Sequence, residues 1–294
     1  MKNSFPYLLA ILLIFSSISS FSQNFQRNNQ QQANIDLVYS DINKSVLTFT
    51  VDQFSLLPVE TMYGKEWIVK INDATAILEK GSPDLPKLTS SLLIPDKARM
   101  EVKVVSTSYK EYTGHTIAPS KGNLYRDIDP STVPYIYGEA YETNAFYPGK
   151  ISELRDPHII RDFRGQTVIV YPVQYNPVTQ TLRVYEEITI EISKVDNNGV
   201  NPIYREKQVD KIVREFGTIY DRQFINYGSA LSRYTPVDEH GNMLIISHES
   251  FIPNIQPFVD WKKRTGTPVE VVDVATIGGS SQIKSYIANY YNTN

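Results

Sequence analysis

The sequence predicts a mainly β-stranded chain that ends in a short α/β segment. Apolar residues recur with period two between Ile35 and Val195, and the chain is rich in Tyr, with 20, and Pro, with 17. Aromatic residues suit half-buried strands, and proline marks the connections between them. After Met243 the pattern changes to strand, helix, strand, helix. We therefore expect an antiparallel sandwich or barrel-like domain, followed by a truncated α/β segment with a parallel sheet.

Length and composition restrict the classes of function. The chain has 294 residues, which predicts two domains large enough to bury their own cores. Its 29 Lys and Arg residues against 32 Asp and Glu residues give a net charge of -3, so nucleic acid is not expected as a partner. The absence of cysteine excludes disulfides, thiolate metal sites and a cysteine nucleophile within these residues.

The first residues have the pattern of a secretory signal peptide. Lys2 gives a positive start, Tyr7 to Phe15 is unbroken apolar sequence, and Ser20 and Ser22 are the small residues before a cleavage point at Gln23. The apolar run is shorter than the roughly 20 residues that span a bilayer, so no membrane span is expected after removal of this segment. We predict a signal peptide over residues 1–22, a polar disordered leader over residues 23–34, and a secreted protein.

The β region is expected to extend from about residue 35 to 195. Its clearest alternation lies between Leu182 and Ile192, and the stretch from Thr167 to Tyr175 is rich in β-forming residues. Asn176 to Thr179 supplies turn residues, which predicts an antiparallel hairpin. Further strands are predicted at Val46–Val51, Trp67–Ile71, Ala76–Glu79, Leu88–Ile94 and Met100–Tyr109.

A long irregular connection interrupts the strands between Gly114 and Lys150. Its tyrosines could anchor a partner, but tyrosine is an ordinary β residue, so we favour a role in capping the sheet edge. Asp127 and Asp129 could hold calcium. The stretch lacks the glycine and distal glutamate of a calcium loop, which disfavours that site, and no metal or other cofactor is assigned to this chain.

A connector with helical periodicity follows the turn cluster at Asp196–Gly199. We expect a helix with one apolar stripe, formed by Val209, Ile212, Val213, Phe216, Ile219, Tyr220 and Phe224. Gly228 to Gly241 has the composition of an exposed linker.

The last segment has β-α-β-α periodicity. Met243–Ile246 and Val269–Val274 are expected to be parallel strands, and Ser280 or Ser281 can cap the final helix. A strand that is apolar on both faces belongs inside a sheet covered on each side. Two strands and two helices cannot supply that cover, so we expect the natural protein to continue past Asn294.

Several ordered motifs resemble the propeptide of gingipain-type cysteine peptidases. They are Ser82–Lys87 (SPDLPK), Met100–Val105 (MEVKVV), Arg161–Gln166 (RDFRGQ), Tyr175–Pro177 (YNP) and Thr181–Tyr185 (TLRVY). Arg233–Val237 resembles the junction at which those zymogens are cut, and Phe258–Lys262 resembles the first helix of their caspase-like catalytic domain. The resemblance implies a propeptide over residues 35–233 and the start of the peptidase domain over residues 234–294.

The resemblance also implies a function. The β domain would keep a secreted Arg-specific or Lys-specific endopeptidase latent, assist its folding, and have its own peptidase domain as partner. The catalytic histidine and cysteine of the family lie beyond the matched part, so this chain is expected to be inactive by itself, and any bound calcium is expected in the missing catalytic part. Arg233 and Tyr234 are the predicted processing residues, with the Arg233 side chain available to fill the specificity pocket.

Other catalytic patterns are weak. His248 ends the first predicted parallel strand, where ligands bind in α/β folds, but a single histidine without a nucleophile is more often structural. Neither G-x-S-x-G nor G-x-x-x-x-G-K occurs, so no catalytic residue is assigned. The alternative function is a secreted β-sandwich binding module whose peptidase domain was lost or has decayed.

Overall fold

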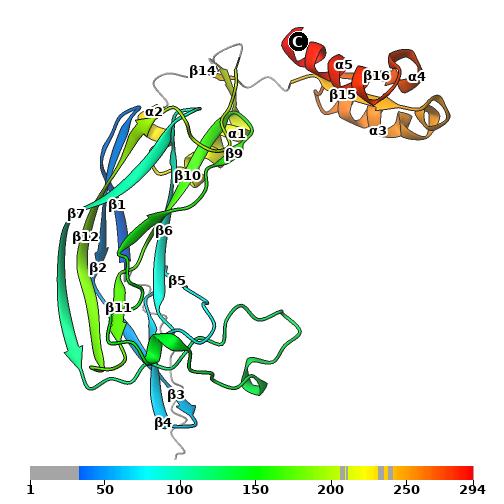
Figure 1. Ribbon diagram of the computed structural model, residues 1–294. Coiled ribbons are helices and arrows are strands. Elements are labelled where there is room, and N and C mark those ends of the chain that lie inside the picture. Colours follow the sequence, from blue (N-terminus) through cyan, green and yellow to red (C-terminus); the bar gives the residue numbers. More distant parts are fainter. Residues whose placement is uncertain (1–32, 206–208, 210, 231–234, 238–240, 294) are drawn as a thin grey trace, which may run out of the picture. The chain divides into compact units, whose positions relative to one another are not determined.

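The computed structural model describes residues 33–205, 209, 211–230, 235–237 and 241–293 (Figure 1). The first set of strands is β1 (Ala33–Ser40), β2 (Lys44–Val51), β3 (Ser55–Thr61), β4 (Gly64–Lys70), β5 (Thr75–Ala76), β6 (Pro86–Leu93), β7 (Arg99–Thr113), β8 (Ser152–Leu154), β9 (His158–Ile160), β10 (Phe163–Val170), β11 (Val173–Asn176) and β12 (Thr181–Asp196). After these come β13 (Lys211–Val213), α1 (Arg214–Gln223), α2 (Tyr227–Ala230), β14 (Thr235–Val237), β15 (Met243–Ser247), α3 (Ile252–Arg264), β16 (Val269–Asp273), α4 (Val274–Ile277) and α5 (Ser280–Thr293).

Two antiparallel sheets form the β domain. The first has the order β1-β2-β12-β11, with β7 paired to the other edge of β12. The second has the order β5-β6-β10-β8, with β9 also paired to β10. Figure 1 shows the long β7 and β12 lying side by side with β2 and β1, while β6 and β10 belong to the other layer.

The two sheets share one core, which makes this domain a sandwich. Alternate residues of β2 and of the middle of β12 face inward and are almost fully buried, because period two sends every second side chain to the same face. The first sheet contributes Leu47, Phe49, Ile188 and Ile190, and the second contributes Leu88, Leu92, Val168 and Val170. Neither sheet closes on itself within the described residues, so the antiparallel sandwich is confirmed and the barrel alternative is not.

The predicted hairpin from Thr167 to Ile192 is only partly correct. The stretch Thr167–Tyr175 is not one strand, because β10 belongs to the second sheet and β11 to the first. The break falls at Pro172, which has no N–H for a ladder. Of β10 and β11, β11 alone pairs with β12, from Val173 with Val184 to Asn176 with Thr181.

Several element boundaries also differ from the prediction. β1 begins at Ala33, within the stretch predicted to be a disordered leader, while residues 23–32 lie outside the described residues. The strand predicted at Ala76–Glu79 is limited to Thr75–Ala76. The hairpin of β3 and β4 was predicted only in its second strand, since Pro58 and the exposed Leu57 obscure the first.

The connector begins with a strand where a helix was expected. Ile212 and Val213 belong to β13, and α1 starts only at Arg214. β13 pairs in parallel with β14, so β13, α1, α2 and β14 form a crossover unit. Short strands of this kind are hidden from a periodicity search, because three residues cannot establish a period.

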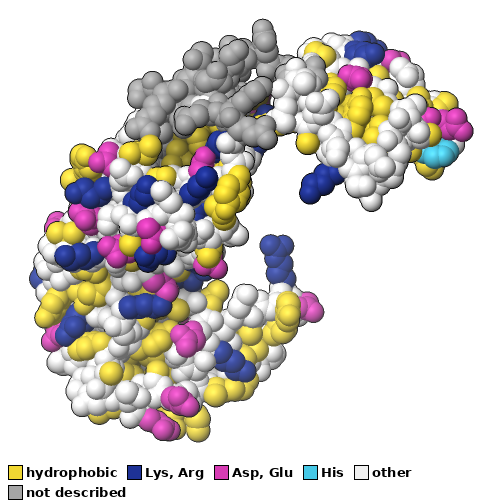
Figure 2. All heavy atoms as spheres, turned by 45° about the horizontal axis from the view of Figure 1, so that its top comes forward, with side chains coloured by type: hydrophobic (Ala, Val, Ile, Leu, Met, Phe, Trp, Pro, Cys, Tyr) yellow, Lys and Arg dark blue, Asp and Glu magenta, His cyan; other side chains and the backbone are white. Residues whose placement is uncertain are grey.

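The α/β segment follows the predicted order of elements. β15 and β16 are parallel neighbours, from Met243 with Val269 to Ser247 with Asp273, and Gly266 ends α3 with a positive φ of 88°. Val274 begins the short α4 and is not part of the strand. Val259 is the single buried residue among those described from 241 to 293, and hydrophobic side chains lie at the surface of this segment (Figure 2).

Candidate functional site

A buried arginine fixes the start of the connector to the sandwich. Arg164, on β10, is fully buried and donates only to backbone carbonyl oxygens. Its Nη1 lies 2.7 Å from Ala98 O and 2.9 Å from Pro95 O, its Nη2 lies 2.6 Å from Val200 O, and its Nε lies 3.0 Å from Asn201 O. Burial lowers the pKa of this guanidinium, and Asp96 opposes that shift. The fork geometry of arginine thus joins two segments that are about a hundred residues apart in sequence.

A second set of polar contacts holds the chain that follows. Arg205 pairs with Asp96, with 2.5 Å between Nε and Oδ2, and also donates to Asp162 O. The Tyr220 hydroxyl donates to Asp162 Oδ2 at 2.7 Å. Burial, followed by this hydrogen bond to Asp162, raises the pKa of Tyr220, so the phenol remains a donor at neutral pH.

A small aromatic cluster packs the connector against the second sheet. It consists of Phe163, Ile212, Tyr220, Phe224 and Tyr227, each no more than 6% exposed. The rings of Phe163 and Tyr220 meet edge to face at 4.9 Å.

Gly165 on β10 is required by this packing. A Cβ there would lie 2.2 Å from Cε1 of Phe224, so only glycine allows the aromatic ring to approach the strand. Asn226 then imitates a strand neighbour of Leu93: its Oδ1 accepts from Leu93 N at 2.7 Å, and its Nδ2 donates to Leu93 O at 3.0 Å.

The predicted processing residues lie between anchored elements. Arg233 and Tyr234 are outside the described residues, as are Ser22 and Gln23 of the predicted signal cleavage point. β14 begins directly after Tyr234 and pairs with β13, Lys211 facing Thr235 and Val213 facing Val237. The chain on the C-terminal side of the predicted cut is therefore a strand partner of the connector.

The long connection from Gly114 to Lys150 is held at its base by the SPDLPK motif and by Gly81, which precedes it. Gly81 N donates to Ser120 O at 3.0 Å, and Gly138 N donates to Gly81 O at 2.9 Å. Asp84 N donates to Ala118 O at 2.9 Å. Figure 1 shows that the segment between these contacts extends away from the sheets as a loop.

The tyrosines of this connection mostly cap the sandwich, as favoured from the sequence. Tyr137 donates to the buried Glu66, Tyr141 donates to Ile117 O at 2.8 Å, and Tyr147 donates to Glu79 Oε2 at 2.7 Å. Tyr125 differs, because it is 80% exposed and is followed by the exposed Arg126. The loop between the basal contacts thus carries an exposed basic side chain, Arg126.

Of the acidic and histidine candidates, Asp129 and His248 have structural roles, and Asp127 is exposed. Asp129 caps a short 3-10 helix by accepting from Ser131 N at 2.9 Å, and this bond lowers the pKa of Asp129. His248 likewise accepts from Ser250 N at 3.2 Å as an N-cap. No group of three or more metal-ligating side chains occurs within the residues that the structure describes.

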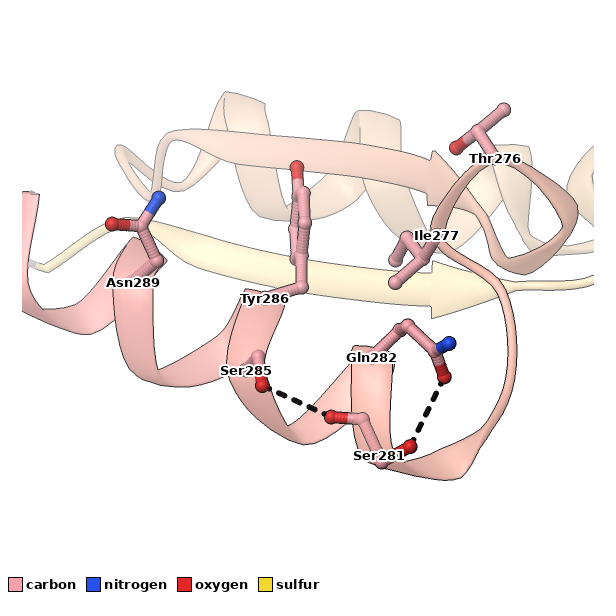
Figure 3. Close-up of a pocket in the computed structure, with 7 residues that line it drawn as sticks. All are labelled: Thr276, Ile277, Ser281, Gln282, Ser285, Tyr286 and Asn289. Atoms are coloured by element: carbon pink, nitrogen blue, oxygen red, sulfur yellow. Dashed lines mark hydrogen bonds between the residues drawn. The ribbon is translucent and has the colours of Figure 1, made fainter.

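A shallow hollow of about 530 Å³ lies in the α/β segment. Figure 3 shows it between α4 and α5, lined by Thr276, Ile277, Ser281, Gln282, Ser285, Tyr286 and Asn289. Ser285 Oγ donates to Ser281 O, and Ser281 Oγ to Gln282 Oε1, both at 3.1 Å. None of these side chains is a histidine or carboxylate that could act as a general base toward the serines, so the hollow has no catalytic pair.

Comparison with known families assigns the two parts of the chain. The Propeptide_C25 family model matches residues 24–228, and the Peptidase family C25 model matches residues 237–294. The sandwich with its connector is thus a propeptide, and the α/β segment is the start of a peptidase domain. The chain belongs to the C25 family, that of the gingipain-type cysteine peptidases and their propeptides.

Relatives of known name agree with this assignment. The chain is 35% identical to gingipain R2 of Porphyromonas gingivalis, over 99% of this chain and 40% of that protein. It is 38% identical to gingipain R1 of the same species, over 83% of this chain and 24% of that protein. A solved structure, the complex of Porphyromonas gingivalis RgpB pro- and mature domains, matches with a TM-score of 0.62 and 37% identity, over 68% of this chain and 98% of that chain.

The chain spans well under half the length of these curated relatives. Within its described residues, none of the helices combines the length and the apolar character needed to cross a bilayer.

Proposed function

We propose that this chain is the N-terminal portion of an exported, latent cysteine endopeptidase. In this proposal the β-sandwich propeptide inhibits the peptidase domain and is separated from it by cleavage after a basic residue. One observation carries the proposal: the propeptide match ends at residue 228 and the peptidase match begins at residue 237, with the predicted junction between them. The matched structure, titled as a complex of pro- and mature domains, supports the peptidase domain as the partner of the propeptide.

Inhibition can be tested directly with the separated parts. Residues 23–233, mixed with the mature peptidase, should block cleavage of a peptide with a basic site. A lack of inhibition at micromolar propeptide concentration would reject the inhibitory role. Heat-denatured propeptide at the same concentration is the control, because it has the same composition without the sandwich.

We assign two basic residues, Arg126 and Arg233, to different steps. A propeptide that binds as a separate partner needs its contact residue within its own fold, and Arg126 lies on a loop held to the sandwich at both ends. Arg233 lies in the linker, where cleavage would break the chain between the two domains. Arg126 would therefore fill the specificity pocket, and the bond between Arg233 and Tyr234 would be the one that is cut. The alternative, expected from the sequence, is that Arg233 itself fills the pocket before it is cut.

Paired variants separate these roles. Arg126→Ala in the isolated propeptide should raise the inhibition constant at least tenfold, while Arg126→Lys should retain part of the inhibition if the pocket recognises charge. Arg233→Ala in the full-length precursor should slow maturation and leave inhibition by the isolated propeptide unchanged. Loss of inhibition with Arg233→Ala but not with Arg126→Ala would instead assign the pocket to Arg233.

Export is tested at the other end of the chain. The N-terminus of the exported, uncut precursor should be Gln23, as determined by mass spectrometry, and Leu12→Arg in the apolar run should retain the precursor inside the cell. We assign no cofactor to this chain and place any calcium in the remaining peptidase part. A chelator should therefore leave the thermal unfolding of the isolated propeptide unchanged.

A further inference from the structure

The predicted cut falls inside a single folded unit. β13, α1, α2 and β14 form a β-α-α-β crossover in which two parallel strands are joined through helices. Cleavage between Arg233 and Tyr234 would open the connection of this unit just before β14 begins. Both strands of the parallel pair would survive the cut, one on each fragment.

β13 is the fixed member of this pair. Ile212 is 3% exposed and packs with Phe163, Tyr220 and Phe224 in the aromatic cluster on the second sheet. α1, which follows β13 directly, also contacts β14. The propeptide thus presents a strand, supported from behind by packed side chains, to the first residues of the peptidase side.

We infer that β13 is a docking edge for β14 (Thr235–Val237), close to the new N-terminus of the peptidase, so that the cut fragments remain joined through the β13–β14 pair. This is strand addition within one chain: backbone hydrogen bonding supplies the attachment, and the partner is an extended peptide. The inference rests on the proposed cleavage point. It adds that cleavage and release of the propeptide are separate steps, and that release requires β14 to leave β13.

The sequence of β14 allows this attachment to be weakened selectively. Pro236 has no N–H, so Thr235 and Val237 carry the N–H groups that β14 itself can donate to β13. Val237→Pro removes one of these donors and keeps the segment extended, because proline at position 237 also favours an extended residue before it. Val237→Ala is the matched control, since it shortens the side chain and retains the N–H.

The experiment uses the full-length precursor with its catalytic cysteine inactivated. Residues 229–233 are replaced by an enteropeptidase site, Asp-Asp-Asp-Asp-Lys, so that cutting before Tyr234 does not depend on the proposed autoprocessing. After complete cleavage, the dissociation rate of the two fragments is measured by dilution and size-exclusion chromatography. The melting temperature of the separated propeptide verifies that the sandwich is intact in every variant.

We expect the cut wild-type and Val237→Ala fragments to co-elute and to separate at similar rates. Val237→Pro should separate at least fivefold faster. Equal rates for Val237→Pro and Val237→Ala would overturn the inference, as would immediate separation of the wild-type fragments on cleavage. The proposed function is tested separately: it would be overturned if the isolated propeptide did not inhibit the peptidase, or if the active precursor did not process itself. The dissociation rates of the inactivated precursor would still decide the role of β13.

Discussion

The sandwich and the α/β segment differ in how completely their apolar side chains are buried. In the sandwich, two sheets cover each other, and inward residues such as Leu47, Val168 and Ile190 are completely buried. In the α/β segment, every residue of β15 is only half-buried, although four of its five residues are apolar. Phe251 and Trp261 remain 59% and 49% exposed on the neighbouring elements.

The difference shows what each kind of strand requires. An alternating strand needs one partner layer, which the propeptide supplies from its own sequence. An apolar parallel strand needs cover on both faces and further strands beside it, which β15, β16 and their helices do not provide within the described residues. The propeptide is therefore expected to fold independently, and the α/β segment to depend on additional structure.

Separating the two regions gives the largest expected effect. Residues 33–230 alone should unfold in one cooperative thermal transition, whereas residues 243–293 alone should show none, because Val259 is their one buried residue. Calorimetry and near-ultraviolet circular dichroism show whether each fragment has a cooperative unfolding transition. A cooperative transition of the isolated α/β segment would show that it needs no further cover.

Within the sandwich, Arg164→Met should be the most damaging single substitution. It leaves the carbonyl oxygens of Pro95, Ala98, Val200 and Asn201 without their buried donor, which should cost about 3–5 kcal/mol of unfolding free energy. Urea denaturation of the isolated propeptide gives this value. Arg99→Met is the control: its ion pair with Asp196 is solvent-exposed, so its loss should change the unfolding free energy little.

The same substitution at two glycines should have opposite effects. Gly165→Ala forces Phe224 away from β10 and should destabilise the propeptide by about 1–3 kcal/mol. Gly217→Ala in α1 meets no atom closer than 3.5 Å and should stabilise it by about 0.5–1 kcal/mol. If Gly165→Ala and Gly217→Ala changed the denaturation midpoint equally, the connector would not pack on the sandwich in solution.

Asp84 should give a smaller, pH-dependent effect. Its Oδ1 is buried without a hydrogen-bond partner, and burial raises the pKa of this carboxyl against the opposing charge of Lys70. Because the folded pKa exceeds the unfolded one, the ionised group destabilises the fold above the folded pKa, and this cost disappears as the pH falls below the unfolded value. Asp84→Asn should therefore stabilise the propeptide by about 1 kcal/mol at pH 7, and the gain should vanish toward pH 4.

The control for this pH effect is the exposed Asp52. Asp52→Asn should change the unfolding free energy little at either pH, because water already solvates that carboxylate. A gain with Asp84→Asn that persists unchanged in acid would refute the assignment to ionisation.

Periodicity predicted most of the sandwich but could not predict which strands share a sheet. β2, β6, β7 and β12 were each located from local alternation, since their inward faces carry regularly spaced apolar residues. The passage of the chain from one sheet to the other at Pro172 was missed, because a continuous apolar run looks the same whether it serves one sheet or two. β3, with its exposed Leu57, offers no such face.

The functional region was less predictable for a different reason. Arg164 lies within the RDFRGQ motif, but its burial depends on carbonyl groups near residues 95–98 and 200–201, which no local pattern connects to it. The pairing of β13 with β14 is likewise non-local and only three residues long. The resemblance of the motifs to a family located the junction, whereas the physical pattern alone identified it only as a linker.

The tyrosines that donate to carboxylates have a spectroscopic consequence. Burial, reinforced by these bonds, raises the pKa of four phenols: Tyr137 on Glu66, Tyr147 on Glu79, Tyr171 on Glu153 and Tyr220 on Asp162. Solvent-exposed phenols in general ionise near pH 10. Phenolate absorbance of the propeptide should thus rise in two stages during alkaline titration, and the second stage should coincide with unfolding. The ultraviolet absorbance of phenolate therefore reports whether this domain is folded, without any added label.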